Sequence, residues 1–290
     1  MGGLTKKATD YFSLVKFIHT VFAMPFAMIG FAIAVRESDH EFSVRLLLLI
    51  ILCMIFARNA AMGFNRLADR KYDSLNPRTS TREIPAGKVA PGSAAIFVII
   101  NAILFIVTTG FINRLTLILS PVALLVILGY SLTKRITYLC HFILGLGLSL
   151  APIGAYISVT GSFSILPLIY SFIVLTWSSG FDIIYALEDE EFDKRNNLYS
   201  LPAAAGRRKA LTVSALLHIV TFLLLVAAGL AGSGNILYWT GAVVFTGLLI
   251  YQHLIVRPDD LSRVTLAFQT TNGIASILYA LFVILDLIFF

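Results

Sequence analysis

The stretch RNAAMGFNRLADRKYDSLNPRTSTREIPAGK, residues 58–88, follows a long apolar run and is dense in charge. Within it, Asn65, Asp69 and Asp73 are four residues apart, so on a helix they drift by only about 80° and share one face. A second stretch, residues 182–195, carries a similar pattern, formed by Asp182, Tyr185, Asp189 and Asp193. The offsets of three, four and four also indicate one helix face. Acidic faces beside apolar spans are costly near lipid, which makes both stretches candidate functional sites.

The composition predicts a membrane protein. Of the 290 residues, 58% are hydrophobic and 13% are charged, which is too apolar for a soluble domain with a polar surface. Apolar runs of about 20 residues recur along the chain and are continuous rather than alternating, which favours transmembrane helices over a barrel. Cys53 and Cys140 show no partner spacing and predict neither a disulfide framework nor a zinc site. We therefore predict an all-α, polytopic fold.

The apolar runs predict nine transmembrane helices, at residues 11–35, 43–64, 91–112, 115–133, 138–160, 164–187, 210–232, 235–255 and 267–289. The N-terminal tail and the loops 65–90, 134–137, 188–209 and 256–266 carry 17 of the 22 lysines and arginines, and the opposite loops carry three. This asymmetry predicts that the first set is cytoplasmic, with the C-terminus on the other side of the cell inner membrane. It also explains the net charge of +6 without a nucleic-acid partner.

A weak internal repeat is visible, because each acidic helix end is followed by a basic loop that contains proline. We predict a single domain, residues 1–290, with pseudo-symmetric halves at about 11–133 and 138–255 and a ninth helix at 267–289. Small residues at 145–154 indicate close helix packing.

Two acidic helix faces offer the oxygen ligands that Mg²⁺ prefers together with phosphate oxygens and water. Basic residues in the same regions would add a clamp for a diphosphate; these are Arg66, Arg70, Lys71, Arg78, Arg82, Lys134, Arg135, Lys194 and Arg195. A diphosphate site at a membrane indicates an amphiphile, such as a polyprenyl diphosphate with its tail among the helices. Loss of diphosphate leaves a carbocation that an apolar cavity shields from water, and an electron-rich ring would be the acceptor.

The two stretches resemble the signatures of a known family. The pattern Asn-x-x-x-Asp-x-x-x-Asp at 65–73, followed by Arg-Thr-x-x-Arg-x-Ile-Pro-x-Gly at 78–87, resembles the first signature of the UbiA superfamily of intramembrane aromatic prenyltransferases. The stretch 182–193 resembles the second. Further matches span the chain: Lys16, His19, Thr20, Pro25, Tyr130, Lys134, Arg135, Thr137, Asn272 and Gly273.

The resemblance implies nine helices around a central cavity and two magnesium ions that bridge the motifs to a polyprenyl diphosphate. It implies that the metals are held by Asn65, Asp69, Asp73, Asp182, Asp189 and Asp193. It implies that Arg82, Lys134 and Arg135 contact diphosphate and that Tyr185 faces the reacting carbon or the diphosphate. Arg66, Arg70, Arg78 and Lys194 complete the basic set expected to bind substrate.

One departure concerns the acceptor. Many 4-hydroxybenzoate members carry Asp directly after the motif asparagine, where this chain has Arg66. The sequence at residues 62–70 and 76–79 looks more similar to the branch of the family assigned to the futalosine route to menaquinone. Members of that branch prenylate a 6-naphthoate. The acceptor is therefore left open between 4-hydroxybenzoate and 1,4-dihydroxy-6-naphthoate.

Three further residues carry alternative interpretations. Arg58 lies roughly 10 Å deeper than Asn65 on about the same helix face, and there it either grips the carboxylate of an aromatic acid or pairs with a backbone carbonyl or a motif aspartate. His19, near Lys16, either positions substrate or packs as a hydrogen-bonded histidine. Asn272 either contacts substrate or ties two helices together.

We predict a Mg²⁺-dependent membrane prenyltransferase that makes a quinone precursor from a polyprenyl diphosphate and an aromatic acid. Two rival classes are a CDP-alcohol phosphotransferase and a cation-coupled transporter. A CDP-alcohol phosphotransferase requires Gly where this chain has Asn65, and it gathers its aspartates in one run of sequence. A transporter does not need the basic loops that follow the two motif helices here.

Overall fold

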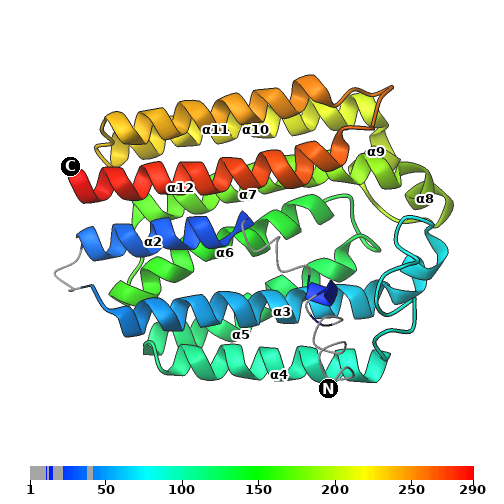
Figure 1. Ribbon diagram of the computed structural model, residues 1–290, viewed down its shortest axis with the longest axis horizontal. Coiled ribbons are helices and arrows are strands. Elements are labelled where there is room, and N and C mark those ends of the chain that lie inside the picture. Colours follow the sequence, from blue (N-terminus) through cyan, green and yellow to red (C-terminus); the bar gives the residue numbers. More distant parts are fainter. Residues whose placement is uncertain (1–10, 12, 16–21, 38–41) are drawn as a thin grey trace, which may run out of the picture.

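The computed structural model describes residues 11, 13–15, 22–37 and 42–290, and this part of the chain contains helices and no β-strand. The long helices lie side by side along one axis (Figure 1). Nine described helices have 14 or more residues: α2 (Met24–Glu37), α3 (Val44–Leu75), α4 (Pro91–Gly110), α5 (Arg114–Thr133), α6 (Cys140–Thr160), α7 (Ile165–Ala186), α10 (Arg207–Ala231), α11 (Ile236–Ile255) and α12 (Asn272–Phe289). The predicted all-α class is confirmed.

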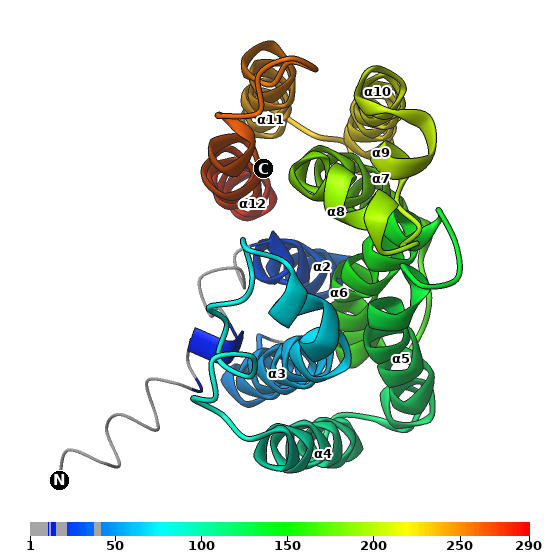
Figure 2. The same ribbon diagram turned by 90° about the vertical axis from the view of Figure 1, so that its right-hand side faces the viewer.

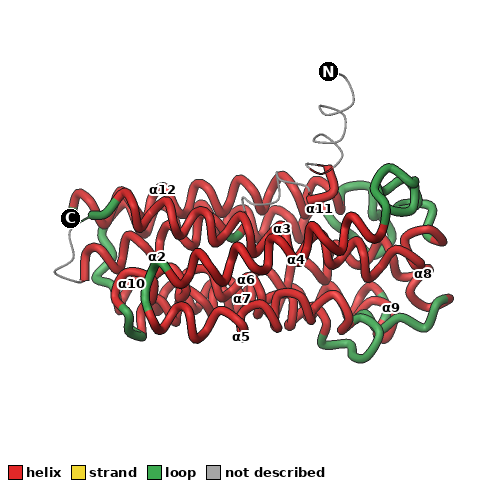
Figure 3. The backbone as a smooth tube through the Cα atoms, turned by 90° about the horizontal axis from the view of Figure 1, so that it is seen from below, coloured by secondary structure: helices red, strands yellow, loops and turns green. Residues whose placement is uncertain are grey.

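Seen along their axes, the helices form two groups (Figure 2). Helices α2 to α6 make one group, and α7, α10, α11 and α12 make the other. Helix α7 packs on α6 and α10, while α2 packs on α6 and α12, so α2 and α7 join the groups. The loops collect at the two ends of the bundle (Figure 3).

One end of the bundle carries the loop 76–90 and the short helices α8 (Glu190–Arg195) and α9 (Leu201–Ala205), and we call it the loop end (Figure 1). The C-terminus lies at the opposite end. Both acidic stretches therefore arrive at the same end of the molecule.

Helix α3 extends eleven residues beyond the predicted boundary at 64, so the first acidic motif is helical throughout. The helix ends at Leu75 because Pro77 follows Asn76, and a residue before proline is driven out of the helical region. Asn76 accordingly has φ −91° and ψ 118°.

The second acidic stretch does not form one continuous face, and that prediction is wrong. Helix α7 ends at Ala186, a 3-10 turn spans Leu187–Asp189, and α8 follows. Because a 3-10 turn has fewer residues per turn than an α-helix, it rotates Asp189 and Asp193 relative to Asp182.

Seven helices in the described part of the chain are long and apolar enough to cross a membrane. Helices α2 and α11 lie outside that set, so the count of nine spans stays a prediction, and the first half of span 11–35 includes residues outside the described ones. Large apolar side chains face outward along the bundle, for example Leu125 at 73% exposure and Val243 at 72%. Such a surface suits lipid contact, and the chain is a multi-pass membrane protein.

An aromatic core joins four helices behind the site. Trp177 of α7 packs against Phe26 of α2 and Phe245 of α11, and Tyr279 of α12 contacts both phenylalanines. All four rings are fully buried. This core holds the second group of helices in register beside the first.

Small residues on α6 have two roles rather than the single packing role that the sequence predicts. A Cβ on Gly145 would lie 2.4 Å from Ser179 Oγ and 2.7 Å from the Leu175 carbonyl, so glycine is required where α6 crosses α7. Gly154 has nothing within 4 Å and instead lines an internal cavity.

Candidate active site

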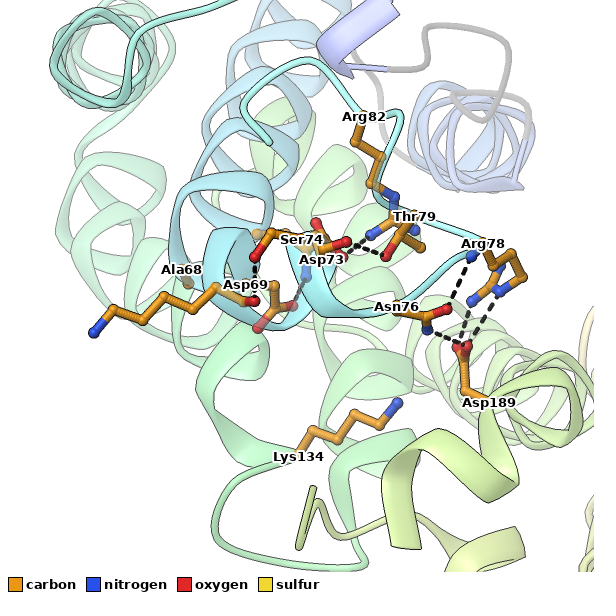
Figure 4. Close-up of polar contacts among 12 residues, drawn as sticks. Ala68, Asp69, Asp73, Ser74, Asn76, Arg78, Thr79, Arg82, Lys134 and Asp189 are labelled. Carbon is orange, nitrogen blue, oxygen red and sulfur yellow. Dashed lines mark hydrogen bonds and ion pairs between the residues drawn. The ribbon is translucent and has the colours of Figure 1, made fainter. Parts of the chain in front are cut away.

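The two acidic motifs meet through the residue that ends α3. The Asn76 amide Nδ2 donates to Asp189 Oδ1 at 2.9 Å, and Asn76 Oδ1 accepts the backbone N–H of Arg78 at 3.0 Å. This asparagine is buried, and its contact with Asp189 is drawn in Figure 4. It therefore joins the first motif to the second and fixes the start of the loop 76–90.

Arg78 extends the same junction. Its Nε donates to Asp189 Oδ1 at 3.1 Å, and its second terminal nitrogen pairs with Asp189 Oδ2 (Figure 4). The other terminal nitrogen donates to the Tyr185 hydroxyl at 2.6 Å. Partial burial acts to lower the pKa of Arg78, but Tyr185 and Asp189 outweigh it and raise that pKa above its ordinary value. The guanidinium of Arg78 is thus permanently charged and is held by Asp189 and Tyr185.

Asp73 and Asp69, on the last turns of α3, each pair with a separate arginine. Arg82 donates to Asp73 Oδ1 at 2.6 Å, while Asp73 Oδ2 is buried without a hydrogen-bond partner among the described residues. Arg135 donates to Asp69 Oδ1 at 2.9 Å, and Asn65 Nδ2 donates to Asp69 Oδ2 at 3.2 Å. The two carboxylates of the first motif therefore face cations, and the four cations paired with motif aspartates, Arg78, Arg82, Lys134 and Arg135, are called the basic rim.

Asp193, on the short helix α8 of the second motif, is fully buried. Lys134, just after α5, lies 2.9 Å from Asp193 Oδ1, and the Ser200 hydroxyl donates to Oδ2 at 2.7 Å. Burial acts to lower the pKa of Lys134, but Asp193 and then Asp189 raise it above its ordinary value. The ammonium is therefore charged at any physiological pH.

Asp182 stands apart from the other motif aspartates. Its Oδ2 lies 2.7 Å from His141 Nδ1 on α6, and the side chain faces an internal cavity. His141 Nε2 accepts the backbone N–H of Leu201 at 3.2 Å. Asp182 is thus held by α6 and α9 rather than by the basic rim.

The acidic residues are paired with bases, not with one another. Among the described residues, no group of three or more His, Cys, Asp or Glu side chains is close enough to hold a metal ion. Asp69, Asp73, Asp189 and Asp193 each face one cation of the chain instead. Any divalent ion at this site must therefore share the carboxylates with basic side chains or displace them.

A cavity of about 440 Å³ lies directly beneath the motifs. Its wall is formed by α3, α4, α5, α6 and α7 together with Phe22 and Phe268, and it is almost entirely apolar. Arg58, Tyr130 and Asp182 supply the charged and phenolic groups of that wall. A volume of this size falls in the range of small-molecule sites.

Arg58 has a buried guanidinium nitrogen, Nε, with no hydrogen-bond partner in the described part of the chain. An unpaired buried donor of a charged group is costly, so this position favours an anion from outside the chain. For Nε, the alternative interpretation that Arg58 pairs with a carbonyl or a motif aspartate finds no contact among the described residues.

Tyr185 connects the cavity to the basic rim. Its ring stacks on Phe268 at a centroid distance of 4.1 Å and an interplanar angle of 19°, and its hydroxyl accepts from Arg78. Phe268 is placed by a π-helical segment, Leu266–Thr271, that precedes α12. Segments of this kind are frequent at functional sites.

Several predicted substrate contacts lie elsewhere. Arg70 is exposed and donates to the Leu67 carbonyl of its own helix at 2.8 Å. Lys194 is exposed and pairs with the buried Glu190 of its own helix, α8. Asn272 is fully buried, accepting from Trp177 Nε1 at 2.8 Å and donating to Ala267 O at 2.9 Å, so it ties helices together.

The remaining predictions divide between buried and undescribed positions. Arg66 is 4% exposed, and its Nε has no partner among the described residues. Lys16 and His19 lie outside the described residues. Glu190, which follows Asp189 directly, is buried and paired with Lys194 and Arg207.

Sequence reasoning assigned no role to four residues that shape the site: Asn76, His141, Ser200 and Phe268. Asn76 could have been recognised as a site residue from the sequence Asn-Pro-Arg-Thr that follows the first motif. His141 and Phe268 sit inside apolar runs, where nothing in the local pattern indicates a partner.

Comparison with known proteins gives a consistent assignment. Residues 23–279 match the model of the UbiA prenyltransferase family. Curated relatives include the 4-hydroxybenzoate octaprenyltransferase of Vibrio atlanticus, 31% identical over 78% of this chain and 79% of that protein. That of Tolumonas auensis is 29% identical over 81% and 82%.

Solved structures share the fold. The apo structure of a UbiA homolog from Aeropyrum pernix has a TM-score of 0.83 at 28% identity and covers 92% of this chain and 98% of that one. A UbiA homolog from Archaeoglobus fulgidus, bound to DMAPP and Mg²⁺, has a TM-score of 0.74 at 21% identity, with coverage of 97% and 100%.

Proposed function

Since this chain belongs to the UbiA prenyltransferase family and is a membrane prenyltransferase, we propose that it transfers a polyprenyl group from its diphosphate to an aromatic acid. The family assignment decides against a CDP-alcohol phosphotransferase and against a transporter. The relatives named 4-hydroxybenzoate octaprenyltransferase support 4-hydroxybenzoate as acceptor. The wording around Arg66 supports 1,4-dihydroxy-6-naphthoate, and hence a role in menaquinone rather than ubiquinone formation.

The observation that carries this proposal is the continuity between charged rim and apolar chamber. Arg78 binds Asp189 and Tyr185 at the loop end, and the Tyr185 ring stacks on Phe268, which lines the cavity. A diphosphate at the rim would therefore have its first prenyl carbons beside Tyr185 and its tail in the apolar cavity. The electron-rich phenol ring suits contact with a developing carbocation.

Mg²⁺ fits the donors present. Asn65, Asp69 and Asp73 offer oxygens from one helix and Asp189 and Asp193 from the other segment, and Asp73 Oδ2 is a buried oxygen without a partner among the described residues. Hard oxygen donors of this kind are typical magnesium ligands. When bound, Mg²⁺ would neutralise the diphosphate and favour its departure. The Archaeoglobus homolog bound to DMAPP and Mg²⁺ supports this choice.

The basic side chains would bind the diphosphate itself. Arg78, Arg82, Lys134 and Arg135 already surround the aspartates, each within an ion pair. Their charge compensates the carboxylates and would compensate a diphosphate as it leaves, while the apolar wall excludes water from the cation.

Arg58 would hold the carboxylate of the aromatic acid. Its unpaired buried nitrogen points to an anion, and a guanidinium binds a carboxylate with two parallel hydrogen bonds. The carboxylate would then sit deep in the cavity with the ring nearer the motifs.

The charge asymmetry of the loops supports a cytoplasmic loop end in the inner membrane. We also propose that the chain works as one domain with two related halves, residues 11–133 and 138–255.

The test is to incubate the purified protein in lipid with labelled polyprenyl diphosphate, Mg²⁺, and each candidate acid in turn. A prenylated product with one acid and not the other would identify the acceptor. Release of diphosphate without any prenylated acid would overturn the proposal.

A further inference from the structure

His141 is a buried histidine to which the proposed reaction assigns no role. It lies in the first turn of α6, is 1% exposed, and bridges two parts of the chain that are far apart in sequence. One ring nitrogen contacts Asp182 of α7, and the other contacts the backbone of Leu201 at the start of α9.

The backbone contact fixes the histidine tautomer. A backbone N–H is always a donor, so His141 Nε2 must accept from Leu201 and carry no proton. The proton then resides on Nδ1, which donates to Asp182 Oδ2 at 2.7 Å. This arrangement fixes both the plane of the imidazole and the carboxylate that it holds.

Asp182 is thereby oriented into the cavity. Its side chain remains 20% exposed although His141 beside it is 2% exposed, and it contributes to the cavity wall with Arg58 and Tyr130. Among the described residues, His141 is its only hydrogen-bond partner, and Oδ2 is the oxygen used. The other oxygen, Oδ1, makes no hydrogen bond within the described part of the chain.

The remaining motif aspartates differ in this respect. Asp69, Asp73, Asp189 and Asp193 each face an arginine or lysine of the rim, where a diphosphate would bind. In the described part of the chain, Asp182 pairs with no such cation, and it lines a chamber to which Arg58 contributes the other charged group. An aromatic acid that carries a hydroxyl group could therefore place its carboxylate at Arg58 and its hydroxyl at Asp182.

We propose that His141 is a positioning residue that holds Asp182 at the cavity wall, so that Asp182 accepts a hydrogen bond from the ring hydroxyl of the aromatic acid. Arg58 binds the carboxylate of the same molecule, so the two contacts set which ring carbon faces the prenyl group. This inference rests on the proposed function, because it takes an aromatic hydroxy acid as the acceptor.

The inference accounts for the separation of Asp182 from the diphosphate site. The 3-10 turn Leu187–Asp189 rotates the end of the second motif toward the rim and leaves Asp182 on the inner face of α7. Ser200 and Leu201, adjacent in sequence, then serve both sides: Ser200 bonds Asp193, and Leu201 bonds His141. The start of α9 thus helps to fix both Asp193 at the rim, through Ser200, and Asp182 at the cavity, through His141.

The test compares acids that differ by the hydroxyl groups. Binding of 4-hydroxybenzoate and benzoate, and of 1,4-dihydroxy-6-naphthoate and 2-naphthoate, is measured by calorimetry on the detergent-solubilised protein with Mg²⁺ and pyrophosphate present. We expect the wild-type protein to prefer one hydroxylated acid over its partner by about tenfold, as a hydrogen bond to a charged group allows.

The variants His141→Leu and His141→Gln separate positioning from packing. We expect His141→Leu to lose the hydroxyl preference while affinity for the unsubstituted acid changes by less than about threefold. Glutamine can still donate to Asp182 and accept from Leu201, so His141→Gln should retain most of the preference. His253→Gln, which alters a histidine bonded to His218 on α10, is the matched control and should change neither affinity.

A preference that survives in His141→Leu, or an equal loss of affinity for both acids of a pair, would overturn the proposal. Wild-type binding without any hydroxyl preference would also overturn it. Prenyl transfer by the wild-type protein is measured in parallel, so failure of the proposed function is seen separately as absence of prenylated product.

Discussion

Asn76 donates to Asp189 across 2.9 Å, and this hydrogen bond joins the end of α3 to the turn that follows α7. The two residues are separated by 113 positions in the chain. The same asparagine accepts the backbone N–H of Arg78, so it also determines where that guanidinium can reach. A neutral amide at this position links an acidic segment to a basic loop without adding charge.

Replacing this amide by a carboxylate should break the junction. We expect Asn76→Asp to lower prenyl transfer by about a hundredfold, because a second carboxylate beside Asp189 is repelled and the donated hydrogen bond is lost. Steady-state kinetics with the labelled diphosphate would measure this. Asn196→Asp is the control, since the Asn196 amide, at the end of α8, donates to the nearby Phe192 carbonyl and contacts no motif residue among those described. Equal activity of the two variants would contradict the assignment.

Arg78 should not tolerate replacement by lysine. Its guanidinium contacts Asp189 through two nitrogens and Tyr185 through a third, a geometry that a single ammonium cannot reproduce. We predict that Arg78→Lys lowers kcat/KM by about a hundredfold, whereas Lys88→Gln, an exposed change in the same loop, stays within about twofold of the wild type. Near-normal kinetics of Arg78→Lys would show that charge alone suffices there.

Asp73 should govern the requirement for magnesium. Chelation by EDTA is expected to abolish transfer, and Mg²⁺ to restore it. Asp73→Asn removes the charge that accompanies the unpartnered Oδ2, so we expect about ten times more Mg²⁺ for half-maximal rate. Asp259→Asn, in an exposed loop, provides the control. A magnesium titration that is unchanged in Asp73→Asn would remove this residue from the metal site.

The first motif was easier to predict from sequence than the second, for a physical reason. Asn65, Asp69 and Asp73 lie on uninterrupted helix, so their four-residue spacing translates directly into one face. The second motif crosses a 3-10 turn, which leaves Asp182 at the cavity and turns the residues after it, so that Lys194 lies at the outer surface. Backbone hydrogen bonding beyond Ala186, not side-chain spacing, decided where those residues point.

Contacts distant in sequence were not accessible to pattern reasoning. His141 and Asp182 are 41 residues apart, and the histidine lies in an apolar run that predicts packing alone. The fold class followed from composition because lipid leaves few alternatives for a continuous apolar run. The partner of each arginine depended instead on how the loop 76–90 crosses the end of the bundle.

Lys134 and Asp193 should be energetically coupled. Asp193 is fully buried, so Lys134→Ala leaves its charge unpaired and is expected to destabilise the protein by about 3 kcal/mol. Adding Asp193→Asn should recover part of that loss. A double-mutant cycle of thermal unfolding in detergent measures the coupling. Additive effects of the two changes would argue that the pair contributes nothing.

The pH dependence that Lys134 contributes to stability has a definite sign. Folding raises the pKa of Lys134, because Asp193 and Asp189 outweigh the effect of burial. A raised lysine pKa stabilises the fold fully below the unfolded value of about 10.4 and loses that effect only as pH rises through the folded value. The stability difference between wild type and the double variant Lys134→Met/Asp193→Asn, which leaves no unpaired buried carboxylate, should therefore be constant from pH 6 to about pH 9.

Asp286 should be a stability residue at the end of the bundle remote from the site. It is 3% exposed, and its carboxylate accepts the backbone N–H of Asn235 at 3.0 Å and of Tyr238 at 3.1 Å. It therefore caps the start of α11 from α12, a role that no side chain of α11 itself fulfils. Removing a cap that satisfies two helix N–H groups costs about 2 kcal/mol.

We expect Asp286→Ala to unfold at lower temperature in detergent while its KM for both substrates stays normal at low temperature. An altered acceptor KM in this variant would mean that helix α12 transmits changes to the cavity, which the packing of Tyr279 against Phe26 makes physically accessible.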